Sequence, residues 1–291
     1  MSGGAALWGA GAALTWGVSD YTARFAGERA GVATATFGMM LVGLVITAIY
    51  VAISGEPIHW SLVGAAYIVG GGIGIAVGTA VLFEALTKGP VSIASPMVAC
   101  YPALSVPITV ALGARPGVWE WIAMGGTIVG VWLVARYVKE SPAAGDETFS
   151  RANIRRTALL ALSSAVIFAV AINGLDLAVV EYGPTITVLG TRSVGVLCFL
   201  AWFLFRRQVP RAPVNSWWII GLIGVLDTAG HFFLYLGLDA EHGEFAVVAS
   251  AAYTVVTVLL ARLFLKEPVS PPQWLGIAIV VGGIASLAIL G

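Results

Sequence analysis

The chain has 291 residues, of which 59% are hydrophobic and only 10% are charged, and its mean hydropathy is +0.94. A soluble domain carries about 25% charged residues, so this composition indicates an integral membrane protein with almost nothing left over for a soluble domain. The formal net charge is zero, which provides no basic surface for nucleic acid. The two cysteines, Cys100 and Cys198, lie inside apolar runs and are interpreted as packing residues.

Apolar stretches of bilayer-spanning length recur along the chain between short breaks that contain glycine, proline and charge. They predict an all-α membrane protein with ten transmembrane helices. The longest polar stretch, residues 138–155, is interpreted as a linker. The ten predicted helices cover approximately residues 4–25, 33–53, 61–86, 91–112, 118–137, 156–179, 184–205, 216–238, 244–265 and 272–290.

The two halves of the chain repeat each other. A shift of 152 residues places Gly31 on Gly183, and the same shift places Tyr101 on Tyr253. Five helices is an odd number, so the second unit must cross the membrane inverted relative to the first. Inverted repeats are a recurring construction of secondary transporters, with the substrate site near the midplane between them. We therefore divide the chain into a first five-helix repeat at 1–137, a polar cytoplasmic linker at 138–155 and a second five-helix repeat at 156–291.

Lysine and arginine are concentrated in one set of predicted loops, as they are in the cytoplasmic loops of membrane proteins. The opposite set holds only Arg115 beside several acidic residues. This asymmetry predicts a multi-pass protein of the cell (inner) membrane with Met1 and Gly291 both outside. The basic residues of the cytoplasmic set are Arg24, Arg29, Lys88, Arg136, Lys139, Arg151, Arg155, Arg156, Arg206, Arg207, Arg211, Arg262 and Lys266.

Three stretches resemble a known family. They are TWGVSDYTARFAG at 15–27 and the paired segments ALTKGPVSIASPMVACYPALSVPITVALGARP at 85–116 and GLDAEHGEFAVVASAAYTVVTVLLARLFLKEP at 237–268. With the ten helices in two repeats, they resemble EamA-type members of the drug/metabolite transporter superfamily. The resemblance implies export or exchange of small metabolites, such as amino acids, through a central cavity. It also implies cytoplasmic termini, whereas the charge pattern predicts the reverse.

Two acidic residues lie near the proposed cytoplasmic ends of their helices. Asp20 has Arg24 four positions further on, and Glu84 has Lys88. One interpretation is an interfacial ion pair between residues i and i+4, worth a few tenths of a kcal/mol. The other is a gate or a proton-coupling site, and both interpretations remain open.

Three ionisable residues are predicted deeper in the membrane. At 1.5 Å per residue, Arg192 lies roughly 12 Å from the outer helix end, His231 roughly 10 Å and Asp227 roughly 16 Å. Asp227 and His231 share one stripe of their helix. Intramembrane ionisable groups are functional by default, so these residues are candidates for substrate binding, and Asp227 and His231 also for proton coupling. The alternative is a structural Arg192–Asp227 pair that locks two helices together.

Three uncharged polar residues complete the candidate substrate site. Asn173 is predicted at roughly 10 Å, close to the level of Arg192. Tyr101 and its repeat partner Tyr253 would face each other across the pseudo-twofold axis if they point inward, where either ring can stack on a ligand or hydrogen-bond to it. Interhelical packing of the two tyrosines is the alternative. The helix at 91–112 contains Pro96, Pro102 and Pro107 and is therefore predicted to kink or break.

These observations favour a secondary transporter of a small organic metabolite, either amino-acid-like or another carboxylate-bearing solute. Proton coupling is one option for its energy source, with His231, Asp227, Glu84 and Asp20 as candidates. The alternative is an intramembrane enzyme or a non-transporting membrane scaffold, in which His231 would need a nearby hydroxyl such as that of Ser193, Thr228 or Ser250. We expect no catalytic residues, no cofactor, no metal and no nucleic-acid partner. The expected partners are a small-molecule substrate and the lipid bilayer, and a homodimer is left open.

Overall fold

The computed structural model describes residues 3–55, 61–113, 115–137, 150–238, 240 and 244–290. Every regular element within these ranges is helical, which confirms the all-α prediction. Most of the predicted linker, residues 138–149, lies outside the described residues. The helices are α1 (Gly3–Ala30), α2 (Val32–Ser54), α3 (Leu62–Lys88), α4 (Val91–Val98), α5 (Tyr101–Ala111), α6 (Val118–Arg136), α7 (Arg151–Phe205), the short η2 (Val214–Ser216), α8 (Trp217–Leu238), α9 (Glu244–Ser250), α10 (Tyr253–Phe264) and α11 (Pro271–Leu290).

The internal repeat is visible in the backbone at two glycines. Gly31 separates α1 from α2 with φ 77° and ψ 148°. Gly183 interrupts α7 with nearly the same angles, φ 76° and ψ 165°. Both positive φ values are readily accessible only to glycine. The two positions are 152 residues apart, so the two arms of α7 on either side of Gly183 correspond to α1 and α2.

A helix break also recurs at this spacing. α4 ends at Val98 and α5 begins at Tyr101, while α9 ends at Ser250 and α10 begins at Tyr253. Pro102 lies in the first turn of α5, where the missing N–H has no helical partner to lose. The second break has no proline and was not expected from the sequence. The repeat architecture, rather than proline alone, therefore determines where both helices break.

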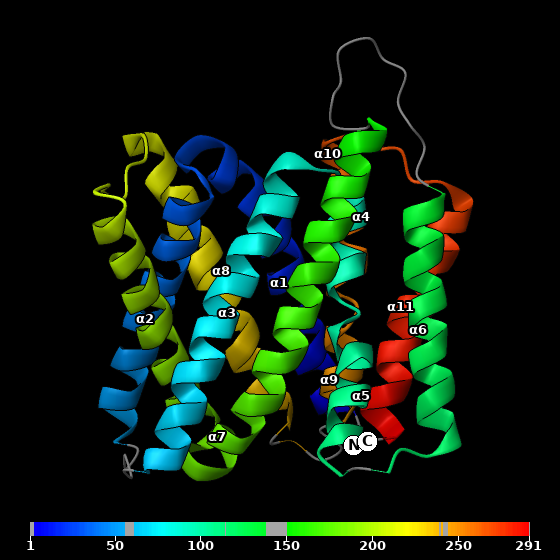
Figure 1. Ribbon diagram of the computed structural model, residues 1–291, viewed down its shortest axis with the longest axis horizontal. Coiled ribbons are helices and arrows are strands. Elements are labelled where there is room, and N and C mark those ends of the chain that lie inside the picture. The colour runs from blue at the N-terminus through cyan, green and yellow to red at the C-terminus, as the bar shows by residue number, and fades with distance from the viewer. Residues whose placement is uncertain are drawn as a thin grey trace.

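The helices stand roughly side by side in a bundle, with both chain ends at its lower end (Figure 1). α1 starts at the lower end and α7 at the upper end, so the two repeats enter the bundle from opposite sides (Figure 1). Among the described residues, seven helical stretches are long and apolar enough to cross a membrane, with both arms of α7 counted as one. The finer count of ten crossings stays a prediction.

Glycines allow helices of the bundle to approach each other closely. A Cβ atom added to Gly130 of α6 would lie only 2.7 Å from the carbonyl oxygen of Gly276 of α11, and the reverse substitution gives the same distance. Between α3 and α7, a Cβ atom at Gly72 would lie 2.8 Å from Val194 Cβ. Small residues at such crossings are the usual basis of helix association in lipid.

The basic residues gather at the end of the bundle opposite the chain ends. α1, α3, α6 and α10 end at the upper end of the bundle, where α7 begins (Figure 1). Most described members of the basic set lie in or just after the last turns of these four helices and in the first turns of α7. Arg115 lies three residues before α6, which begins at the lower end (Figure 1).

Candidate functional site: two adjoining chambers in the bundle

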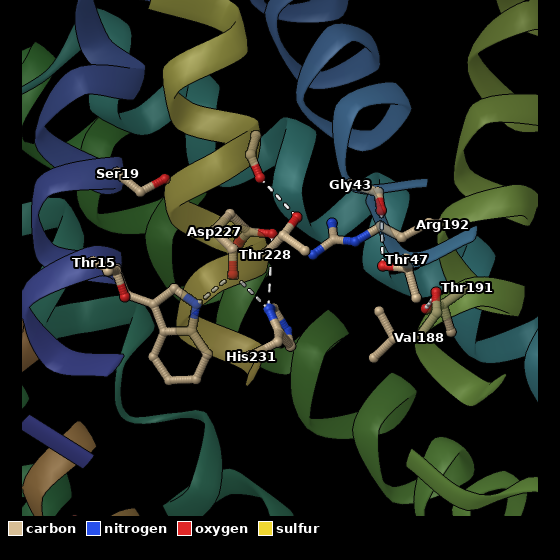
Figure 2. A network of polar contacts seen from close by, with 12 residues as sticks. Thr15, Ser19, Gly43, Thr47, Val188, Thr191, Arg192, Asp227, Thr228 and His231 are labelled. Carbon is tan, nitrogen blue, oxygen red and sulfur yellow. Dashed lines mark hydrogen bonds and ion pairs between the residues drawn. The ribbon is translucent and has the colours of Figure 1, made fainter. Parts of the chain in front are cut away.

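Arg192 and Asp227 form an ion pair inside the bundle. Arg192 extends from the second arm of α7 toward Asp227 on α8, and its Nη2 contacts Asp227 Oδ2 (Figure 2). Their side chains are only 6% and 20% exposed. Gly43 of α2 leaves room for this crossing, because a Cβ atom there would lie 3.3 Å from Arg192 Nε and 3.0 Å from Thr228 Oγ1. The two candidate residues therefore act on each other directly.

His231 lies one helical turn from Asp227 and contacts its backbone. His231 Nδ1 is 2.8 Å from the carbonyl oxygen of Asp227 and 3.8 Å from the carboxylate Oδ2. A carbonyl oxygen only accepts, so the neutral ring holds its proton on Nδ1 and leaves Nε2 as an acceptor. Trp16 of α1 donates from Nε1 to the same carbonyl oxygen at 3.2 Å and meets the histidine ring edge-on at 5.2 Å. α1 and α8 are thus joined at this group of residues, Trp16, Arg192, Asp227 and His231, which we call the polar centre.

These side chains line a cavity of about 200 Å³, which we call the inner chamber. Its wall combines residues of α1, α2, α3, α4 and α5 of the first repeat with residues of α7, α8 and α10 of the second. The candidate residues on this wall are Asp20, Tyr101, Arg192, Asp227, His231 and Tyr253. The structure thus gathers six of the eight candidate residues around one cavity between the repeats.

Asp20 is not paired with Arg24, and that interpretation of the sequence was wrong. Ser95 Oγ donates to Asp20 Oδ2 at 3.4 Å. Arg24 turns away toward the end of the helix and pairs with Glu28 at 2.9 Å and Glu267 at 3.5 Å. Within the described ranges, no basic side chain forms an ion pair with Asp20. Its carboxylate instead belongs to the wall of the inner chamber.

Glu84 does not line the inner chamber. Its Oε1 is 2.7 Å from Lys88 Nζ and 2.8 Å from Arg156 Nη2, so the expected i,i+4 ion pair is present and a second cation joins it. Glu84 lines a separate apolar groove of about 500 Å³ together with Trp202 and Cys198. Its position fits the interfacial ion pair better than a proton site beside Asp227.

Asn173 is also separated from the arginine. Its Nδ2 donates to the Ala169 carbonyl oxygen at 2.7 Å, within its own helix. It lines a larger cavity of about 540 Å³, the outer chamber, whose lining comes from α1, α5, α6, α7, α9, α10 and α11. The sequence count grouped Asn173 with Arg192 because it considered depth along each helix alone. Equal depth does not place two side chains on the same cavity wall.

Tyr101 and Tyr253 lie where the two chambers meet. Both tyrosines line the inner and the outer chamber, as do Trp16 and Ile172. The Tyr253 ring meets the Trp16 ring edge-on at 6.3 Å, and the Tyr101 ring meets Phe168 at 6.3 Å. The two repeat-related tyrosines therefore lie between the outer chamber and the Arg192–Asp227 pair.

The hydroxyl groups proposed as nucleophiles for an enzyme are engaged elsewhere. Ser193 donates to Leu189, Thr228 to Gly224 and Ser250 to Val247, in each case to a carbonyl oxygen of the residue's own helix. Within the described ranges, histidine, cysteine, aspartate and glutamate side chains form no group of three or more that could hold a metal ion.

Glu267 has a structural role that sequence reasoning missed. This residue follows α10, and its carboxylate accepts the backbone N–H groups of Val91 at 2.9 Å and Ser92 at 2.8 Å. These groups belong to the first turn of α4, where a negative charge is favoured by the helix dipole. Arg24 lies 3.5 Å from the same carboxylate. Through these contacts Glu267 binds the second repeat to the first, at the end of the bundle opposite the outer chamber.

Matches with known proteins identify the family and support the fold. The model of the EamA-like transporter family matches residues 3–136 and again residues 155–289. An uncharacterized protein of Methanocaldococcus jannaschii is 28% identical over 111 residues, which covers 38% of this chain and 81% of that relative. One solved crystal structure, described only as that of a protein, aligns over 98% of each chain with a TM-score of 0.64 and 18% identity, and it supports the fold alone.

Proposed function

The chain belongs to the EamA-like transporter family, with two EamA domains, and from this premise we propose that it is a secondary transporter of a small amino-acid-like or other carboxylate-bearing solute. The family is a transporter family and not an enzyme family. The observation that carries the proposal is the inner chamber, because its wall is built from both repeats and holds the Arg192–Asp227 pair. Substrate sites between inverted repeats are exposed to each side in turn when one repeat rocks against the other.

Arg192 can hold a substrate carboxylate without releasing Asp227. A guanidinium group carries five N–H donors, and the contact with Asp227 Oδ2 uses the Nη2 end. A planar donor array of this kind suits carboxylates. Arg192 keeps its charge at all physiological pH values, so its role as a clamp would not depend on protonation. Export or exchange is the proposed direction, in line with the family resemblance.

Reconstituted vesicles test this proposal. Purified protein in proteoliposomes should carry labelled amino acids or related carboxylates down an imposed gradient, and should exchange them when the solute is present on both sides. Protein-free liposomes are the control for leakage. Failure to move any solute of a broad metabolite panel would contradict transport and favour a membrane scaffold.

We further propose that His231 and Asp227 couple transport to protons. Histidine is the side chain whose ordinary pKa, about 6.5, lies in the physiological range, and His231 lies one turn from Asp227, which pairs with Arg192. His231→Gln keeps hydrogen bonding but cannot titrate, and it should flatten the pH dependence of flux between about pH 5.5 and 7.5 while preserving substrate binding. The measurement is liposome flux across a series of pH values, with Ser193→Ala as a matched polar control.

An unchanged pH response in His231→Gln would remove the histidine from the mechanism and leave Asp227, Glu84 or Asp20 as proton-coupling candidates. Flux without any pH response in the parent protein would instead indicate a facilitator or exchanger. The polar centre would then act as a substrate clamp only.

The orientation of the protein is a separate proposal with its own test. The distribution of basic residues predicts that Met1 and Gly291 lie outside and that the 138–155 linker is cytoplasmic. Alkaline phosphatase fused after Gly291 should be active, and a fluorescent protein at the same position should be dark. Fusions within the linker should give the reverse pair of results. Bright fluorescence with an inactive phosphatase at Gly291 would overturn the orientation.

A further inference from the structure

The walls of both chambers carry more carboxylate groups than guanidinium or ammonium groups. In the inner chamber Arg192 is the single lysine or arginine among the described residues of the lining, and it pairs with Asp227, as does His231 when it is protonated. Within this lining, no lysine or arginine is therefore left to balance Asp20. The described lining of the outer chamber includes Asp176 and Glu120 and no lysine or arginine. A solute that crosses the outer chamber toward Asp20 meets carboxylates at each level.

Aromatic rings accompany Asp20 on the wall. Trp16 lies one turn before Asp20 on α1, and both side chains line the inner chamber together with Tyr101 and Tyr253. The Trp16 and Tyr253 rings are nearly perpendicular, with 6.3 Å between their centroids. One of the two rings therefore turns only its edge to the other, which leaves its own faces uncovered by that ring. Faces of tryptophan and tyrosine attract cations, and more strongly when the cation is desolvated.

The local hydrogen bonds leave the Asp20 carboxylate available. Among the described residues, the Asp20 carboxylate accepts a hydrogen bond from the Ser95 hydroxyl at 3.4 Å, which is longer than the usual 2.5–3.0 Å of an O–H···O bond. An ionised carboxylate has about four acceptor positions on its two oxygens. A carboxylate at this depth is costly without a cation, and a substrate cation would remove that cost when it binds.

We propose that Asp20, together with Trp16, Tyr101 and Tyr253, binds an ammonium group of the transported solute. The substrate class is therefore an organic amine, and a carboxylate on the same molecule is compatible with it but not sufficient. In an amino acid, the ammonium group binds at Asp20 and the carboxylate binds at Arg192 across the same chamber. This inference rests on the proposed transport function and specifies which end of the solute is recognised.

Three probes of similar shape test the charge preference. Phenethylamine is a cation, N-acetylphenethylamine is neutral and 3-phenylpropionate is an anion, and all three carry a phenyl ring on a two-carbon chain. Binding to the purified full chain in detergent is measured by calorimetry. We expect phenethylamine to bind at least tenfold more tightly than the other two. Asp20→Asn should weaken the binding of phenethylamine by at least tenfold and leave the binding of N-acetylphenethylamine unchanged.

Variants of Tyr253 separate the aromatic contribution from the fold. Tyr253→Phe keeps the ring and should bind phenethylamine within about twofold of the parent, whereas Tyr253→Leu should bind it several-fold more weakly. The melting temperature of each variant without ligand reports whether it folds. If Asp20→Asn does not fold, the comparison of the three probes on the parent protein and the Tyr253 pair still decides the matter.

The outcomes distinguish this inference from the proposed function. Failure of phenethylamine to bind, equal binding of all three probes, or preference for 3-phenylpropionate overturns the ammonium site. Liposome flux of carboxylates that carry no amine would leave transport standing and overturn the amine requirement. Amine-selective binding that depends on Asp20, without flux of any solute, would support the ammonium site and contradict the transport function.

Discussion

Replacing either Arg192 or Asp227 by alanine is expected to lower the free energy of unfolding by about 3–5 kcal/mol, because each change leaves the other charge buried without its partner. The arginine side chain is only 6% exposed, so the loss in Asp227→Ala should be at the upper end of this range. The Asp227 side chain lines the chamber and is 20% exposed. The loss of stability in Arg192→Ala, which leaves Asp227 without its partner, should therefore be at the lower end of this range.

The double variant provides the decisive comparison. Arg192→Ala with Asp227→Ala removes both charges, and its loss of stability should be smaller than the sum of the single losses by about 0.5–3 kcal/mol. Thermal or denaturant unfolding in detergent gives the three values. Glu84 and Lys88 form a matched control pair at 2.7 Å, with side chains 24% and 52% exposed, for which a coupling of about 0.2–1 kcal/mol is expected. Simple additivity at Arg192 and Asp227 would show that the pair does not stabilise the protein.

The contact between Arg192 and Asp227 could be anticipated because depth along a helix can be counted from the sequence. A constant rise of 1.5 Å per residue placed the two side chains within one helical turn of each other. The same count placed Asn173 at this level, yet Asn173 lines the outer chamber and bonds to Ala169 of its own helix. Depth is a property of one helix, whereas the direction of a side chain depends on how neighbouring helices pack.

The contacts of Arg24 show where local spacing misleads. Both Asp20 and Glu28 lie four residues from Arg24, and the sequence alone cannot choose between them. The structure adds Glu267, which is more than 200 residues away and is brought to Arg24 by the packing of the two repeats. Long-range partners of this kind leave no periodic signal, and for this reason Glu267 could not be recognised as the residue that caps α4.

The fold was predicted more completely than the site because its signals repeat along the chain. Gly31 and Gly183 share both the sequence offset and a left-handed backbone, so the alignment of the halves had direct structural meaning. The break at Ala251 and Ala252 has no sequence signal of its own. Its counterpart at Ala99 and Cys100 is flanked by prolines, and only the offset of 152 residues transfers that information to the second repeat.

Glu267→Gln is expected to destabilise the protein by about 1–3 kcal/mol, because a buried backbone donor loses its acceptor. The carboxylate is only 3% exposed in its side chain and accepts from both Val91 and Ser92. A glutamine retains one carbonyl oxygen, but its NH₂ group would face the second N–H, and neither can accept. The change also removes the negative charge from the N-terminal end of α4 and from Arg24.

Glu28→Gln is the matched control for this measurement. Glu28 pairs with the same Arg24 at 2.9 Å, but its side chain is 42% exposed, so its removal should change stability by less than about 1 kcal/mol. Thermal unfolding of both variants and the parent protein gives the comparison. Equal effects of the two substitutions would mean that Glu267 acts only as a surface ion partner of Arg24. A clearly larger loss for Glu267→Gln would place the stabilising contact at the first turn of α4, where Glu267 of the second repeat accepts hydrogen bonds from the backbone of the first.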